Sequence, residues 1–111
     1  MPTLYRAVNA NPPTAEDFTS NKAKGKPRRE PYEREDEWAG ISTFDTEARC
    51  RAKAADYDLG TFIAEVDIPD DAPIRIGQVN RRGHCTIWGD PDDLLRYVTA
   101  VTRVQDAERQ V

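Results

Sequence analysis

The residues that carry most metal and thiol chemistry are scarce in this sequence. It contains one histidine, His84, and two cysteines, Cys50 and Cys85. The cysteines fall in separate predicted elements and are too few for a disulfide framework, so we expect reduced, partly buried thiols. A single histidine with two distant cysteines is also too small a set for a zinc site, which needs several protein ligands. We therefore predict a protein without a bound metal.

Long apolar runs are also missing. No window approaches the roughly 20 apolar residues that a membrane-spanning helix requires. The opening Met-Pro-Thr-Leu-Tyr-Arg lacks the cationic start and apolar run of a secretory signal. We therefore expect no membrane association and a cytoplasmic location.

Common nucleotide and redox motifs are absent as well. The chain has no Gly-x-Gly-x-x-Gly, no P-loop and no Cys-x-x-Cys. Its formal net charge is −4, which disfavours nucleic acid as a partner because a phosphate backbone attracts positive charge. Hydrophobic residues make up 38% of the chain and charged residues 32%, so we expect a modest core and a large solvated surface.

The length of 111 residues fits one domain. We predict a single domain over residues 1–104, with a charged mobile loop at 21–37, and a flexible tail at 105–111. The loop begins with cations, Lys22, Lys24, Lys26, Arg28 and Arg29, and ends with acidic residues. The simple interpretation is a solvated loop whose halves attract each other weakly. The alternative is a lid or a loop that faces a phosphate.

Alternating apolar and polar residues predict strands that present one face to a core. The predicted strands span residues 3–8, 40–44, 61–68, 74–78, 84–88 and 98–104. A continued helix is an alternative for the last of these. Helices are expected to begin at Ala15, Thr46 and Pro91. We therefore predict an α+β fold with a mainly antiparallel or mixed sheet and two to three short helices.

Capping residues and small side chains support two of the helices. Asp45 is the expected N-cap of the helix over residues 46–57. Alanines 48, 52 and 55 form one stripe on this helix, which would allow close packing on the sheet. Ahead of the short helix, Thr14 is the expected N-cap and Asp17 completes a shortened capping box.

Residues 83–91 read Gly-His-Cys-Thr-Ile-Trp-Gly-Asp-Pro and concentrate rare side chains. Asp90 and Pro91 suit the N-cap and the first position of a helix. Neighbours on a strand point to opposite faces, so His84 and Cys85 would not form a reactive pair. The segment is either a structural corner or a corner with one site residue, His84.

Charged and hydroxyl side chains within strands are the other candidates. Arg6 lies mid-strand on an apolar face, so it either pairs with Glu65 or Asp67 or grips a carboxylate or phosphate of a ligand. Glu65 faces solvent or a cleft. Ser42 and Thr43 precede a helix, where they either have an ordinary strand role or line a site.

Taken in order, these residues resemble the ADP-ribosyltransferase-like superfamily, including its small toxin-type branches. Members with an Arg-Ser-Glu arrangement carry an arginine on the first strand, a Ser-Thr strand ahead of a helix, and a late glutamate. Leu-Tyr-Arg-Ala-Val at 4–8 resembles the first of these, and Ser-Thr-Phe at 42–44 resembles the second. The chain is also similar to short bacterial proteins that share the Tyr-Arg opening and the Gly-His-x-Thr-x-Trp-Gly-Asp-Pro ending, a likeness that implies no activity.

The superfamily resemblance implies NAD as cofactor. It implies that Arg6 holds the NAD phosphate or ribose and that Ser42 and Thr43 shape the nicotinamide pocket, with His84 beside them. The resemblance also implies a glutamate that orients the ribose or the acceptor. Glu65 is the candidate, although it precedes the strand where the family places its own and no Glu-x-Glu occurs near the C-terminus. His84 or Asp90 is the alternative. The implied catalytic set is therefore Arg6, Glu65 and His84.

Two functions follow as hypotheses. The first is an NAD- or nucleotide-binding ADP-ribosyltransferase-like domain, active or degenerate. The second is a non-catalytic module, such as an accessory or immunity-type protein, that binds a partner protein through the 22–37 loop, Trp38 and Trp88. The discriminating observation is whether Arg6, Ser42, Thr43, His84 and a carboxylate line one cleft.

Overall fold

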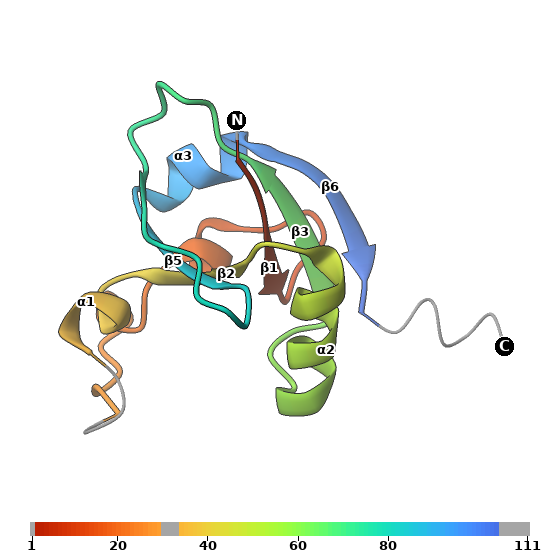
Figure 1. The fold of residues 1–111 in the computed structure, drawn as a ribbon, viewed down its shortest axis with the longest axis horizontal. Coiled ribbons are helices and arrows are strands. Elements are labelled where there is room, and N and C mark those ends of the chain that lie inside the picture. The colour runs from red at the N-terminus through yellow and green to blue at the C-terminus, as the bar shows by residue number, and fades with distance from the viewer. Residues whose placement is uncertain (1, 30–33, 105–111) are drawn as a thin grey trace, which may run out of the picture.

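A single six-stranded sheet organises the chain, as the computed structural model of residues 2–29 and 34–104 shows (Figure 1). The strand order is β4-β5-β2-β1-β3-β6, and every neighbouring pair is antiparallel. The strands are β1 (Thr3–Val8), β2 (Ile41–Phe44), β3 (Phe62–Asp67), β4 (Arg75–Ile76), β5 (His84–Trp88) and β6 (Val98–Arg103). The described residues also form a 3₁₀ helix, η1 (Ala15–Phe18), and the helices α1 (Glu35–Trp38), α2 (Glu47–Tyr57) and α3 (Pro91–Arg96). The predicted α+β class is confirmed.

The two faces of the sheet carry separate hydrophobic clusters. Alternation along β1 and β3 directs Leu4, Val8 and Val66 to one face, where they pack with Phe18 of η1 and Leu94 of α3. The other face carries a second cluster, under α2, of Phe44, Cys50, Ala54, Ile63 and Val104. Both faces of the sheet are filled because side chains alternate between faces along each strand.

The predicted packing face of α2 is wrong. Alanines 48, 52 and 55 are exposed, whereas Cys50 and Ala54 are buried. Both sets are spaced three or four residues apart, so each forms a stripe on one helix face. Arg51 fixes the orientation, because its Nη1 donates to the carbonyl oxygens of Arg103 and Val104 at 2.6 Å. Packing of α2 on β1, β2 and β3 therefore buries the Cys50 face, which joins Phe44 and Ile63 in one cluster.

The N-cap of α2 also differs from the prediction. Thr46 caps the helix, and its side chain accepts from the Arg49 N–H at 3.2 Å. Asp45 instead donates its backbone N–H to the Gly83 carbonyl at 2.9 Å. A Cβ at Gly83, where φ is +82°, would collide with Asp45 and Arg49. The glycine before His84 therefore lets the β4–β5 loop approach the start of α2.

The segment predicted as a charged loop contains structure. The helix α1 was not predicted, and Trp38 at its end donates its indole N–H to the Lys26 carbonyl at 2.8 Å. Trp88 donates its indole N–H to the Asp36 carbonyl at 2.9 Å. The first bond joins two parts of the segment, and the second ties the segment to β5. Residues 30–33 of the predicted loop and the predicted tail at 105–111 lie outside the described residues.

The sheet opens between β1 and β2. β1 pairs with β3 over its full length, from Thr3 opposite Asp67 to Val8 opposite Phe62. Its register with β2 has the single pair Tyr5–Phe44. Beyond that pair, towards Val8, the two strands separate. Arg6, on the Val8 side of that pair, bonds to the Asp17 carbonyl of η1. No helix within the described ranges is long and apolar enough to cross a membrane.

Candidate nucleotide site at the sheet opening

Arg6 occupies the opening between β1 and β2. Its Nη1 donates to the Ser42 carbonyl at 2.7 Å and its Nε donates to the Asp17 carbonyl at 2.6 Å. The first bond bridges β1 and β2 where their ladder pairing stops, and the second ties β1 to η1. Burial lowers the pKa of the Arg6 guanidinium to about 10, so the group stays charged at neutral pH.

The carboxylates expected to pair with Arg6 have other partners. Asp67 accepts from the Thr3 hydroxyl at 2.6 Å, and Glu65 accepts from the Thr99 hydroxyl at 2.9 Å. Arg6 is therefore held by backbone carbonyls, a structural role that differs from the ion pair suggested by the sequence. The Nη2 group of Arg6 makes no hydrogen bond within the described chain.

Ser42 and His84 form a side-chain pair next to the opening. His84 Nε2 lies 3.1 Å from Ser42 Oγ. The imidazole ring meets the Phe44 ring edge-on, with centroids 5.6 Å apart. Burial lowers the pKa of His84; the Glu37 carboxylate opposes this shift and the Lys53 ammonium reinforces it. The imidazole is therefore neutral at pH 7 and available to accept or donate one hydrogen bond.

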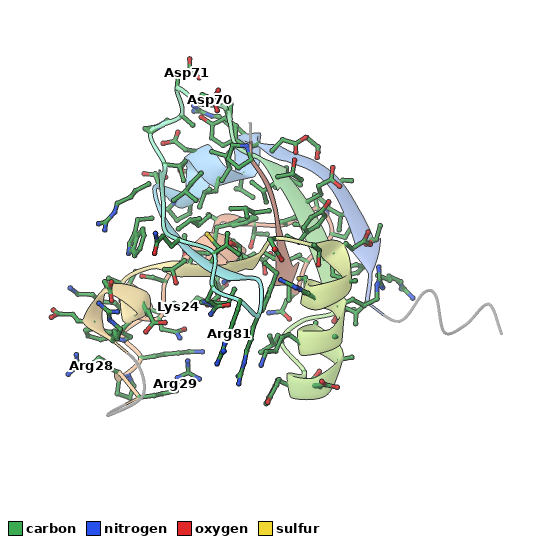
Figure 2. All side chains as sticks on the ribbon, viewed as in Figure 1. Lys24, Arg28, Arg29, Asp70, Asp71 and Arg81 are labelled. Carbon is green, nitrogen blue, oxygen red and sulfur yellow. The ribbon has the colours of Figure 1, made fainter. Side chains whose placement is uncertain are left out.

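Arg6, Ser42 and His84 line one cavity of about 650 Å³. Drug-sized ligands commonly occupy cavities of about 300–1,000 Å³. Most charged residues in its wall are cationic. The cationic residues are Arg6, Lys24, Lys26, Arg29 and Lys53. Figure 2 shows Lys24, Arg29 and Arg81 around the lower side of the molecule, while Asp70 and Asp71 lie at the opposite end. A protein of net charge −4 thus concentrates positive charge at this cavity.

Asp17 supplies the one carboxylate among the described residues that line this cavity. Its Oδ1 accepts the Asn9 N–H and its Oδ2 accepts the Thr14 N–H, both at 2.9 Å. The second of these bonds belongs to the predicted capping box of η1. The Asp17 carboxylate therefore organises the turn after β1 and anchors the wall of the cavity.

Thr43 and Glu65 lie outside the cavity. The Thr43 hydroxyl is buried on the opposite face of the sheet, where it donates to the Cys85 carbonyl at 2.7 Å. Strand alternation explains this, because neighbouring residues such as Ser42 and Thr43 point to opposite faces. Glu65 lines a separate cleft of about 30 Å³ with Tyr5 and Glu47. Burial raises the pKa of Tyr5, and the nearby Glu65 carboxylate raises it further.

The end of α2 contributes residues that the sequence interpretation missed. Lys53, Tyr57 and Leu59 line the cavity opposite the 21–29 segment. The Lys53 ammonium lies 4.5 Å from the centroid of the Tyr57 ring. The cations of the 21–29 segment were predictable, because the sequence offered a phosphate-facing loop as the alternative interpretation of that segment. The α2 residues were not predictable, because their place depends on how the helix docks.

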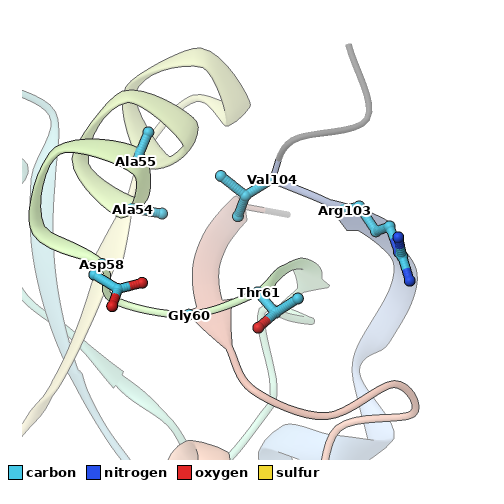
Figure 3. Close-up of a pocket in the computed structure, with 7 residues that line it drawn as sticks. All are labelled: Ala54, Ala55, Asp58, Gly60, Thr61, Arg103 and Val104. Carbon is cyan, nitrogen blue, oxygen red and sulfur yellow. The ribbon is translucent and has the colours of Figure 1, made fainter. Parts of the chain in front are cut away.

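A second cavity, of about 190 Å³, lies between the end of α2 and β6. Figure 3 shows Ala54 and Val104 pointing toward each other in its wall, while Arg103 extends away. None of the sequence-predicted site residues lines it. In the described ranges, no cluster of three or more His, Cys, Asp or Glu side chains is arranged to hold a metal ion. The larger cavity at the sheet opening is therefore the candidate site.

Comparisons with protein-family models, with curated proteins and with solved structures find no match to this chain.

Proposed function

We propose that the cavity at the sheet opening binds NAD or a related nucleotide, in an ADP-ribosyltransferase-like domain. The observation that carries this proposal is the meeting of Arg6, Ser42 and His84 with several lysines in one 650 Å³ cavity. These residues come from β1, β2, β5, α2 and the 21–29 segment. Their convergence gives the cavity the positive charge that a pyrophosphate group requires.

Each residue has a defined part in such binding. The Nη2 group of Arg6, together with Lys24 and Lys26, would hold phosphate oxygens. The Ser42 hydroxyl and the neutral His84 imidazole, 3.1 Å apart, would hydrogen-bond ribose hydroxyls or an amide. Bound NAD would supply the bond between ribose and nicotinamide that such enzymes cleave.

The positions of the carboxylates favour a nucleotide-binding role over an ADP-ribosyl transfer reaction. A transfer reaction needs a carboxylate that stabilises positive charge developing on the ribose. Glu65 lies in another cleft, and the Asp17 carboxylate accepts two backbone N–H groups. We therefore propose a degenerate member that binds the nucleotide and transfers ADP-ribose slowly or not at all.

A thermal melt with NAD tests the proposal. Millimolar NAD is expected to raise the Tm, because a ligand that binds the folded state stabilises it. The double variant Lys24→Ala/Lys26→Ala should lose most of this shift. The matched control, Arg82→Ala/Arg96→Ala, removes the same charge outside the cavity and should keep the shift. The absence of any shift in the wild-type protein would refute the proposal.

A further inference from the structure

The end of α2 places two large apolar side chains beside the cations of the cavity. Tyr57 is 65% exposed and Leu59 is 46% exposed, although both line the cavity. A single exposed apolar residue needs no explanation, but adjacent ones at a concave site indicate a ligand surface.

The backbone directs Leu59 toward this position. Asp58 has a φ of +52° and caps α2 in the left-handed conformation. The Leu59 N–H donates to the Ala54 carbonyl at 3.2 Å, the bond that closes a Schellman-type end. In that motif the apolar residue after the cap commonly packs back on the helix. Leu59 instead remains half exposed and lines the cavity.

Lys53 lies between this apolar surface and the polar pair of the site. Its Nζ is 4.5 Å from the centroid of the Tyr57 ring, and it is close enough to His84 to influence the pKa of the imidazole. The cavity therefore changes character along its length. Lys24, Lys26 and Arg6 bring cations to the wall from the 21–29 segment and β1, whereas the end of α2 brings Tyr57 and Leu59 beside Lys53.

We infer that Tyr57 and Leu59 form a platform on which the base of the nucleotide stacks while its phosphates contact the cations. This inference rests on the proposed function and specifies the ligand class: a phosphate ester that carries an aromatic ring, in preference to a bare polyanion. Aromatic side chains stack on bases of every kind because each base has a π-face. The platform thus selects for a base without selecting a particular one.

Calorimetric titration of the full chain with NAD, ADP and inorganic pyrophosphate tests the platform. The wild-type protein should bind ADP at least about tenfold more tightly than pyrophosphate, because only ADP reaches the platform. Tyr57→Ala should weaken NAD and ADP binding about tenfold and leave pyrophosphate binding unchanged. Tyr57→Phe keeps the ring and should bind all three as the wild type does. Val79→Ala, at a residue that is 47% exposed and outside the cavity, is the matched control.

The outcomes separate this inference from the proposed function. If NAD binds the wild-type protein and Tyr57→Ala equally well, the platform is wrong and the nucleotide site stands. Equal affinity of the wild type for ADP and pyrophosphate would also overturn the platform. If none of the three ligands binds, both proposals fall. Because the Tyr57 side chain is exposed, the Tm without ligand should be the same in all variants.

Discussion

The two sides of β1 are held in different ways. Toward β3, pairing is continuous from Thr3 to Val8, and the buried side chains are apolar. Toward β2, pairing has one register position, and the Arg6 guanidinium donates to the Ser42 carbonyl across the gap. The paired side gives the domain its core, whereas the open side exposes charged and hydroxyl groups to a cavity. The difference shows how one strand serves both stability and a site.

Charge is distributed according to the same division. Arg6 is tolerated inside the sheet because its guanidinium donates to two backbone carbonyls, that of Ser42 on β2 and that of Asp17 in η1. Lysines from the 21–29 segment and from α2 gather around that arginine. Mutual repulsion among them is a cost that a bound anion would remove. Nucleotide binding should therefore stabilise the open side in particular.

The largest expected effect tests the paired side. Ile63→Ala should lower the free energy of unfolding by about 3 kcal/mol, because it leaves a void in the cluster under α2. Leu59→Ala removes a half-exposed side chain on the open side and should change the free energy of unfolding by less than about 0.5 kcal/mol. Urea unfolding of both variants measures the contrast. Similar losses for the two would mean that the sides do not differ in packing.

A smaller effect is expected from Arg6→Lys. An ammonium keeps the charge, but it cannot reproduce the planar guanidinium that donates to the Ser42 and Asp17 carbonyls at the same time. One carbonyl should then be left unsatisfied, with a loss of about 2 kcal/mol in unfolding free energy. Arg96→Lys, on an exposed helix end, is the control. An unchanged stability of Arg6→Lys would show that the guanidinium does not hold the opening together.

The smallest effect concerns pH. Burial lowers the pKa of His84 in the folded chain, so the unfolded chain takes up this proton more readily. The stability that results is complete above the unfolded pKa of about 6.5 and declines as the pH falls through that value toward the folded pKa. Unfolding free energies at about pH 7.5 and about pH 5.5 should therefore differ more in the wild type than in His84→Gln. The same pH difference in both proteins would show that the His84 imidazole is solvated in the folded chain and that its pKa is not lowered.

Local sequence patterns predicted much of the fold. Alternation located the strands, and Thr14, Asp17 and Asp90 were correctly assigned to helix starts. The docking face of α2 was mispredicted because the Cys50 and Ala48 stripes have the same helical spacing. The helix α1 was missed because a segment of four residues has too few positions to show a period.

The candidate site was predictable only in part. Arg6 and His84 stood out as rare side chains on strands, and they do line one cavity with Ser42. Alternation along β2 and β5 separates Thr43 from Ser42 and His84. Lys53 and Tyr57 had no signal, because their role depends on a strand separation and a helix placement that no local pattern encodes.

The most direct measurement of the central claim is a titration of the isotopically labelled protein with NAD, followed by amide NMR shifts. The account predicts concentration-dependent, saturable shifts at Ala7, Ser42, His84 and Tyr57, on the open side of β1. Amides at the centre of the β3–β6 pair, such as Ala64 and Val101, should remain in place. Shifts confined to the β3–β6 side, or no shifts at millimolar NAD, would contradict it.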